Sequence, residues 1–534
     1  LSSRAPVRLG ERCTVFMERD VNSYLQRGAE KKDIVAGLAY SIAYNYLNRL
    51  VGRRHIGDTI YFQGGTAYND AVAAAFSMIL DKEIIVPPYN GVMGAIGAAL
   101  LAREKMAATG ARSRFRGWDL EQVHYTVREF TCKGCSNECD IRQFTIDGEK
   151  TYWGDKCSDR YRKRAKTDRQ PLVRDLVEFR SALLYSYVTE AEDTKPLLRS
   201  GSGSRLGTIG IPRAMYTYER LPFWATFFKA CGFDVAVSRE TDKKIREAGI
   251  EASVAEPCFP IRVAHGHVAE LLEEDVDYVF IPNLLNEETD HPEIESHACP
   301  WGQTLPHVIR LAPRFAGQER RLLTPTLHFR RGPQAVGEAL QAALKPLGVP
   351  PKVVETALKE AYEAQTDFRA RLIMAGADAL ATLAEHDELA IVLVGRPYNI
   401  YDPGVNMDIP AKLRRYYGVD LIHYDFLPLW GQDVRRVTPN MFWNYGRRIL
   451  QAALVAAEHP NLHLIYMTNF KCGPDSYVKH YVHAACPDPF LVLQFDEHTN
   501  DTGAMTRCEA YLDSKGFLRW WAREDRTREP VREG

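Results

Sequence analysis

The sequence predicts an α/β protein with a small cysteine-rich β module followed by two doubly wound parallel-sheet lobes. Three observations predict this: strand-length apolar runs alternate with helical patterns after Leu206, four cysteines share one β-patterned stretch, and the chain has 534 residues, 45% of them hydrophobic. A chain of this length holds several cores, and 26% charged residues is ordinary for folded proteins, which excludes disorder. We expect the domains 1–107, 108–170, 171–385 and 386–534.

The charge balance excludes two classes of partner. Lys and Arg total 68 and Asp and Glu total 69, which gives a net charge of -1. Without a basic excess we expect no binding to nucleic acid or to a membrane surface. The most apolar stretches, such as Ala71–Leu80, are too short to span a bilayer, and no export leader is visible, so we expect a cytoplasmic protein. Because the chain opens on Leu1 rather than Met, we also expect its natural N-terminus to lie upstream.

The first hundred residues predict a mixture of helices and short strands. We expect helices within Glu18–Leu50, Asp70–Leu80 and Gly91–Ala102 and strands at Ile60–Phe62 and Glu83–Val86. In the third helix, Gly94 and Gly97 allow close backbone approach. The turn at Gly64, Gly65 and Thr66, between a strand and a helix, can receive the phosphates or sugar of a nucleotide, but an ordinary tight turn explains it equally well.

Two α/β alternations follow the serine–glycine run at residues 200–204. The expected strands are Gly207–Ile211, Phe233–Val237, Tyr278–Ile281, Ala390–Val394, Val419–His423, Leu462–Met467 and Phe490–Phe495. The expected helices are Glu219–Ala230, Ile261–Glu273, most of residues 334–386, Ile409–Tyr416 and Phe442–Ala457. Strands separated by helices predict parallel sheets covered on both faces.

Eleven cysteines without a leader favour metal or redox chemistry over disulfides. The first group has the spacing Cys132-x2-Cys135-x3-Cys139-x17-Cys157, in which close thiols and a distant partner on β arms can converge on one metal site. Thiolates suit zinc and iron–sulfur clusters alike, so the metal stays open.

A second group is dispersed and consists of Cys258, Cys299 and Cys472. Each lies among Pro or Gly residues, and we expect each beyond the carboxyl end of a strand, where open α/β sheets bind their ligands. Three thiolates from two lobes can hold a cubane cluster and leave one iron open, but each cysteine by itself is more often inert packing. We keep Cys486 as a weak candidate for a fourth ligand.

Other polar residues have plainer explanations. His265, His267, His291 and His297 are titratable groups that can ligate metals, although satisfied structural histidines are commoner. Arg396 follows a strand and can meet an anion, but a structural ion pair is the safer interpretation.

Several segments of the first hundred residues resemble one family. Residues 12–18 read RCTVFME, residues 62–69 read FQGGTAYN, residues 86–88 read VPP and residues 93–99 read MGAIGAA. They resemble the end of the activator ATPases of the 2-hydroxyacyl-CoA dehydratase and benzoyl-CoA reductase systems, over about residues 10–107. The resemblance implies a truncated subdomain of actin/hexokinase-like fold. It also implies that Cys13 helps hold a [4Fe-4S] cluster shared across a homodimer, and that Gly64, Gly65 and Thr66 border the adenosine.

The remainder resembles long activase-related proteins that fuse such an ATPase to a dehydratase-subunit-like region. The segments FTC at 130–132, PCFPI at 257–261, CPWGQ at 299–303 and CGPDS at 472–476 carry this resemblance. Dispersed cysteines of the dehydratase subunits bind a cluster near the acyl-CoA, which implies that role for Cys258, Cys299 and Cys472. These three thiols are too few for a double-cubane cluster.

The sequence departs from the activator ATPases at three features. The family's first phosphate loop, its catalytic acidic residues and its second cluster cysteine have no match in these residues. We therefore expect no ATP hydrolysis by the chain as it stands, and ATP binding only by the intact protein.

The leading hypothesis is an iron–sulfur redox protein that passes low-potential electrons to a thioester substrate or a partner. The resemblance implies a homodimer, an acyl-CoA substrate or an electron-accepting dehydratase, and reduced ferredoxin or flavodoxin as the donor. The alternatives are a zinc-stabilised binding or regulatory protein without a redox role, and an ATP-dependent small-molecule kinase whose catalytic half lies upstream.

Overall fold

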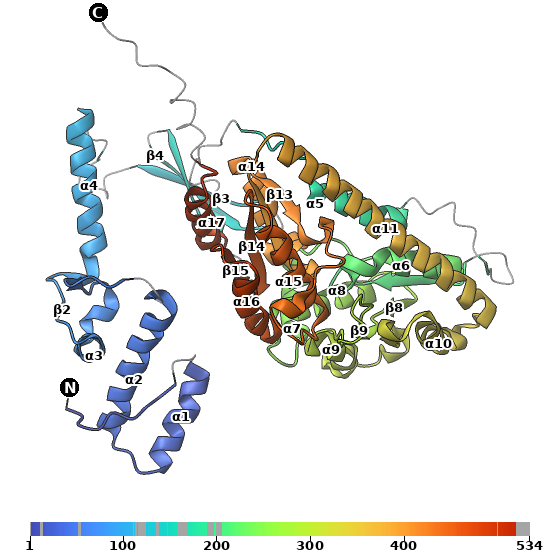
Figure 1. Ribbon diagram of the computed structural model, residues 1–534, viewed down its shortest axis with the longest axis horizontal. Coiled ribbons are helices and arrows are strands. Elements are labelled where there is room, and N and C mark those ends of the chain that lie inside the picture. The colour runs from blue at the N-terminus through green and yellow to red at the C-terminus, as the bar shows by residue number, and fades with distance from the viewer. Residues whose placement is uncertain are drawn as a thin grey trace, which may run out of the picture. The chain divides into compact units, whose positions relative to one another are not determined.

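The computed structural model forms two compact units, Leu1–Val123 and His124–Gly534, which we describe separately (Figure 1). The structure describes residues 2–10, 14–51, 55–110, 112, 115, 124–134, 138–146, 148–156, 169–189, 197–198, 205–498 and 500–518. Among these residues no helix is both long and apolar enough to cross a membrane.

The N-terminal unit is mostly helical and has a small core. Its helices are α1 (Thr14–Gln26), α2 (Lys31–Tyr46), α3 (Asp70–Leu80) and α4 (Met93–Thr109), and its strands are β1 (Ile60–Tyr61) and β2 (Ile84–Ile85), which pair in parallel. The core consists of Ala39, Ala43, Val72, Ala75 and Phe76. Helix α2 is only partly buried: Ala39 and Ala43 lie inside, whereas Val35 and Ile42 are exposed.

Helix α4 differs from the prediction made for its glycines. A Cβ built on Gly94 or Gly97 would meet no atom within 4 Å among the described residues, and no described residue of this helix is buried. The close backbone approach predicted at these two glycines is therefore not found.

A three-stranded antiparallel sheet opens the second unit. Its strands β3 (Tyr125–Thr131), β4 (Asp140–Ile146) and β5 (Glu149–Trp153) lie in sequence order. Thr131 pairs with Asp140 and Arg142 pairs with Trp153, so β3 and β5 both end beside the start of β4.

The first lobe is built on a parallel sheet of order β10-β8-β6-β7. Its strands are β6 (Thr208–Ile211), β7 (Asp234–Val237), β8 (Tyr278–Phe280) and β10 (Leu322–Leu323), and the pair β9 (Asn283–Asn286) and β11 (Thr326–His328) extends β8 and β10. Its helices are α6 (Thr217–Ala230), α7 (Lys243–Ala252), α8 (Phe259–Glu273), α9 (Pro300–Leu311), α10 (Pro333–Leu344) and α11 (Pro351–Glu385), and α5 (Leu176–Thr189) packs against α6.

The second lobe is a parallel sheet of order β13-β12-β14-β15. Its strands are β12 (Ala390–Gly395), β13 (Asp420–His423), β14 (Leu462–Asn469) and β15 (Leu491–Phe495). Its helices are α12 (Pro397–Ile400), α13 (Pro403–Asn406), α14 (Ile409–Tyr417), α15 (Asn444–Ala457), α16 (Gly473–Ala485) and α17 (Thr502–Ser514). Every residue of β12 is buried, as expected for a central parallel strand. The predicted α/β class with several parallel sheets is thus confirmed.

The two lobes share one hydrophobic core, and helix α11 joins them (Figure 1). This helix packs against α6 of the first lobe and reaches the turn Tyr424–Phe426 of the second. A Cβ on Gly376 would lie 1.8 Å from the Phe426 carbonyl oxygen, so only glycine lets the helix approach this closely.

Candidate functional site

The three dispersed cysteines occupy equivalent positions at the starts of helices. Cys258 is the N-cap residue of α8, Cys299 that of α9 and Cys472 that of α16, and each helix has a proline in its first turn. Proline suits that position because the first N–H groups of a helix lack intrahelical acceptors. The local sequence around each cysteine therefore encodes a helix start with the thiol at its N-cap.

At one of these N-caps the sulfur accepts a hydrogen bond from a backbone N–H in the first turn: the Gly302 N–H donates to Cys299 Sγ at 3.3 Å. The side chains of Cys258 and Cys472 make no such cap hydrogen bond. The backbone N–H groups of Ile261 and Asp475, three residues along, nevertheless lower the pKa of these two thiols against the larger effect of burial. Three helix N-termini thus direct backbone dipoles at sulfur, an arrangement that favours negative charge.

The structure brings these three segments together. Lys471 Nζ donates to Glu256 Oε2 at 2.6 Å, which joins the loop before Cys258 to the loop before Cys472. The segment that carries Cys299 pairs with the second lobe, because the His297 N–H donates to the Phe442 carbonyl oxygen at 2.7 Å. The charge of Cys258 interacts with those of both Cys299 and Cys472.

The three sulfurs are grouped but not in mutual contact. Among the described residues, one group of His, Cys, Asp or Glu ligand atoms lies within 4.8 Å of one another, and it consists of the largely exposed Asp496, Glu497 and His498. At least one pair of the three sulfurs is therefore more than 4.8 Å apart. Ligands on a single tetrahedral zinc, with Zn–S bonds of about 2.3 Å, lie about 3.8 Å apart, so the three thiols as placed do not form a single-ion site.

The thiols are strongly desolvated. Burial first, and the nearby Cys299 second, raise the pKa of Cys258 to about 12. Burial and then the Asp475 carboxylate raise the pKa of Cys472 as well. A thiolate at this site therefore needs positive charge from a bound metal in addition to the helix dipoles.

Arg396 is the buried cation of the site, and it forms the structural ion pair that the sequence favoured. Its Nε donates to Asp475 Oδ1 at 3.0 Å, and its Nη2 lies 2.9 Å from the same oxygen. The Thr468 hydroxyl donates to the other oxygen of Asp475. Because this pair is internally neutral, it leaves the three thiolates without a net compensating charge.

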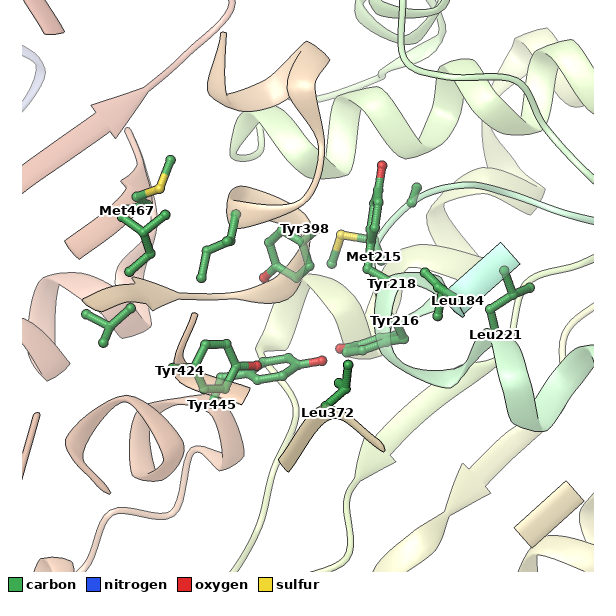
Figure 2. Packing of buried hydrophobic residues seen from close by; sticks show 14 of the residues in the cluster. Leu184, Met215, Tyr216, Tyr218, Leu221, Leu372, Tyr398, Tyr424, Tyr445 and Met467 are labelled. Carbon is green, nitrogen blue, oxygen red and sulfur yellow. The ribbon is translucent and has the colours of Figure 1, made fainter. Parts of the chain in front are cut away.

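Buried tyrosines lie near the thiols. Figure 2 shows the side chain of Tyr216, from the first lobe, pointing toward that of Tyr445, from the second. The charge of Tyr398 interacts with all three cysteines, and that of Tyr216 with Cys299. Burial raises the pKa of both phenols, so they remain protonated hydrogen-bond donors.

A cavity of about 600 Å³ lies beyond this layer, between α11 and the two lobes. Its wall combines buried polar residues, including Glu219 and Glu287, with apolar ones such as Phe368 and the exposed Trp430. Tyr445 connects it to the thiol site, since its hydroxyl donates to Glu219 Oε2 at 2.9 Å while its ring centroid lies 5.7 Å from Arg396 Cζ.

The remaining candidates from the C-terminal half have structural roles. Cys486 follows the last residue of α16, at the end opposite Cys472 and roughly 20 Å away by helix rise, so the weak expectation of a fourth ligand there is wrong. His265 Nδ1 bonds the Ile261 carbonyl at 2.8 Å, and His267 lies between the hydroxyls of Ser238 and Thr241, each at 2.9 Å.

His291 and His297 do not join the thiol site. His291 lies 3.7 Å from Asp290 and 3.5 Å from Glu293, and His297 Nε2 lies 3.8 Å from Glu295. Both contacts are with acidic side chains of the same loop.

Only part of the local cysteine group falls within the described residues. Cys132 follows β3 and Cys139 precedes β4, and the Cys132 N–H donates to the Cys139 carbonyl oxygen at 2.8 Å. Cys139 is buried and Cys132 is half-buried. Cys135 and Cys157 lie outside the described residues.

The nucleotide-binding candidates of the N-terminal unit are separate from these sites in the sequence. Gly64 has a positive φ of 94° before a short 3-10 turn, Gly65–Tyr68, that contains Thr66. A Cβ on Gly64 or Gly65 would meet no atom within 4 Å among the described residues. Cys13 lies outside the described residues.

Fold and candidate site define an α/β protein in which three helix-start cysteines come from two parallel-sheet lobes. Residues 2–102 match the BadF/BadG/BcrA/BcrD ATPase family, and residues 208–427 match the CoA enzyme activase uncharacterised domain. These two segments are therefore similar to those families, which confirms the resemblance found in the sequence.

The curated relatives match the ATPase segment. The 2-hydroxyisocaproyl-CoA dehydratase activator of Clostridioides difficile is 37% identical over 102 residues, 19% of this chain and 38% of that protein. The (R)-2-hydroxyglutaryl-CoA dehydratase activating ATPase of Acidaminococcus fermentans is 39% identical over 101 residues, which are 19% of this chain and 38% of that protein. The chain thus spans about two fifths of the length of these relatives.

One solved structure shares this similarity. It is the activator of the 2-hydroxyisocaproyl-CoA dehydratase from Clostridium difficile with bound ADPNP, 33% identical over 21% of this chain and 43% of that chain, with a TM-score of 0.19.

Sequence reasoning missed the residues that lie around the three cysteines. Tyr216, Asp475 and Tyr445 lie next to apolar or helical patterns that explain them as core or cap residues. Asp475 alone carried a usable signal, as an acidic residue in the first turn after Cys472.

Proposed function

We propose that the protein is an iron–sulfur redox protein of the 2-hydroxyacyl-CoA dehydratase activase type, with a [4Fe-4S] cluster on Cys258, Cys299 and Cys472. The single observation that carries this proposal is the convergence of three N-cap cysteines, one buried and two half-buried, from two lobes. The similarity of residues 2–102 and 208–427 to activase families supports the redox class.

The residues at the site fit such a group. At least one pair of the three sulfurs is wider apart than the ligands of a single ion, and the Gly302 N–H donates to Cys299, as backbone N–H groups do to the sulfurs of a thiolate-bound cluster. The unpartnered Tyr216 hydroxyl adds a further donor beside Cys299. When bound, the cluster supplies a one-electron carrier.

The chain's own residues hold and shield this site. Cys258, Cys299 and Cys472 bind, the three helix N-termini offset the thiolate charge, and the Arg396–Asp475 pair fixes the start of α16. Tyr216, Tyr398 and Tyr445 exclude water. We assign the passage of low-potential electrons to a thioester substrate or a dehydratase partner, and the cavity of about 600 Å³ is the nearest space for an acceptor.

The N-terminal unit supplies the nucleotide-dependent part of the proposal. The relatives it resembles are dehydratase activators, one of them named an activating ATPase. We assign ATP to the intact protein, with Gly64, Gly65 and Thr66 beside the adenosine and Cys13 at a cluster shared between two copies of the chain. Reduced ferredoxin or flavodoxin is the proposed electron donor.

A second metal belongs to the proposal, on Cys132, Cys135, Cys139 and Cys157. Cys132 and Cys139 leave adjacent strands beside each other, as the ligands of one zinc or iron–sulfur site do.

Strictly anaerobic purification followed by iron, zinc and sulfide analysis and EPR of the dithionite-reduced protein tests the proposal. We expect iron with labile sulfide in the wild type and their loss from the three-thiol site in Cys472→Ala, while metal at Cys132–Cys157 is retained. Cys486→Ala, at the far end of the same helix, is the matched control. It should keep the iron and sulfide of the three-thiol site and the metal at Cys132–Cys157.

Two results would contradict the assignment. Iron and sulfide that are unchanged in Cys472→Ala would refute the site. Zinc as the sole metal of the wild type would replace the redox function with a zinc-stabilised binding role.

A further inference from the structure

Tyr216 presents an unpaired hydroxyl inside the thiol site. The residue precedes the first turn of α6, at the carboxyl end of β6, and is 5% exposed. Its Oη has no hydrogen-bond partner among the described residues. A buried hydroxyl without a partner destabilises the folded protein, so a hydroxyl retained at such a position calls for an acceptor.

One acceptor beside this hydroxyl is the sulfur of Cys299. A Cβ on Gly302 would lie 2.0 Å from Tyr216 Oη and 3.3 Å from Cys299 Sγ, so both atoms border the space left by one missing side chain. Gly302 also donates its N–H to the same sulfur. The glycine in the first turn of α9 therefore leaves room for the Tyr216 hydroxyl beside Cys299.

The neighbouring phenol in this layer has a different partner. The hydroxyl of Tyr445 donates to Glu219, in the wall of the cavity of about 600 Å³. Figure 2 shows Tyr216 approaching from the first lobe and Tyr445 from the second. The two tyrosines thus share a layer but differ in what their hydroxyls bind, which makes one a control for the other.

We propose that Tyr216 donates a hydrogen bond to the metal-bound Cys299 sulfur and thereby raises the reduction potential of the centre. This inference rests on the proposed function. Adding an electron increases the negative charge on the ligand sulfurs, so a fixed O–H donor stabilises the reduced form more than the oxidised form. Tyr216 is in this sense a positioning residue that sets the electron affinity of the site without binding metal.

The test is a redox titration of the Tyr216→Phe protein, followed by EPR and compared with wild type. Phenylalanine keeps the ring and removes only the hydroxyl. At a fixed applied potential we expect the ratio of reduced to oxidised centre to fall about tenfold, as for one lost charge-assisted hydrogen bond. Iron and sulfide content should remain at the wild-type level.

Two further variants make the result specific. Tyr445→Phe should leave the reduced-to-oxidised ratio unchanged, because its hydroxyl binds Glu219 rather than sulfur. Gly302→Ala should lower the ratio in the same direction as Tyr216→Phe, since the new methyl group takes the space of the hydroxyl.

The outcomes separate this inference from the proposed function. An unchanged ratio in an iron-loaded Tyr216→Phe protein overturns the inference and leaves the proposed function standing. Loss of iron in that variant also overturns it, because Tyr216 would then be needed to build the site. A wild-type protein without iron overturns the proposed function and this inference with it.

Discussion

The two cysteine regions of the C-terminal unit differ in how they are built. Cys258, Cys299 and Cys472 come from three helix starts in two lobes and are enclosed by buried tyrosines. Cys132 and Cys139 lie at the ends of neighbouring strands in a three-stranded sheet, where β3 is almost entirely exposed. The first site depends on the packing of the whole unit, whereas the second depends on one hairpin.

Under the proposed function, this difference favours redox chemistry at the first region and structural support at the second. A buried site limits water and lets nearby dipoles act in a low dielectric, which is where a protein can control the charge of a metal centre. A site on an exposed sheet has weaker electrostatic control and serves best to hold the strands together.

The largest effect should come from Cys132→Ala, as the counterpart of Cys472→Ala. It removes one thiolate from the group Cys132, Cys135, Cys139 and Cys157. We therefore expect the metal content of the β module to be lost, which is one metal site per chain. Iron and sulfide at the three-thiol site should stay unchanged, because that site lies on other elements. Metal analysis of anaerobically purified protein is the measurement. Loss of metal from both sites would contradict the independence of the two cysteine regions.

Asp475→Ala should produce the next largest effect, on stability. It leaves the Arg396 guanidinium buried without its partner, which costs about 3–5 kcal/mol of unfolding free energy. Urea unfolding of the metal-free protein measures this. Arg142→Ala, which breaks an exposed 2.8 Å pair with Glu129 in the β module, is the matched control and should cost less than about 1 kcal/mol. Equal losses would contradict the contrast between the two regions.

The smallest expected effect is a pH dependence carried by His267. Burial lowers its pKa to about 3, from an ordinary value of 6.5, so the folded protein keeps it neutral. Below about pH 6.5 the unfolded chain takes up the proton and the folded chain does not, so stability is lost as the pH falls toward 3, by about 1.4 kcal/mol per pH unit. Denaturation at pH 7 and pH 5.5 should show a shallower loss for His267→Gln than for wild type. An identical slope would exclude His267 as the titrating group.

Much of the fold follows from local sequence patterns. The runs around Ala390–Gly395 and Leu462–Asn469 are strand-length and apolar throughout, as buried parallel strands are, and the structure places them at the centre of the second sheet. Strands β9 and β11 were not predicted because they are short and each directly follows a proline, Pro282 or Pro325.

The candidate site, like the fold, was predictable from the sequence only in part. The sequence predicted Cys258, Cys299 and Cys472 beyond the carboxyl ends of strands; this is wrong for Cys258, which follows helix α7, whereas Cys299 comes after β9 and Cys472 after β14. What the sequence by itself determined is the local backbone, because the Pro residues near the three cysteines favour a helix start at each. Only the tertiary structure decided which groups lie beside them: Tyr216 comes from the start of α6, and Cys486 is excluded by the length of α16. Such contacts depend on how the lobes close over a shared core, and no periodicity along the chain records that.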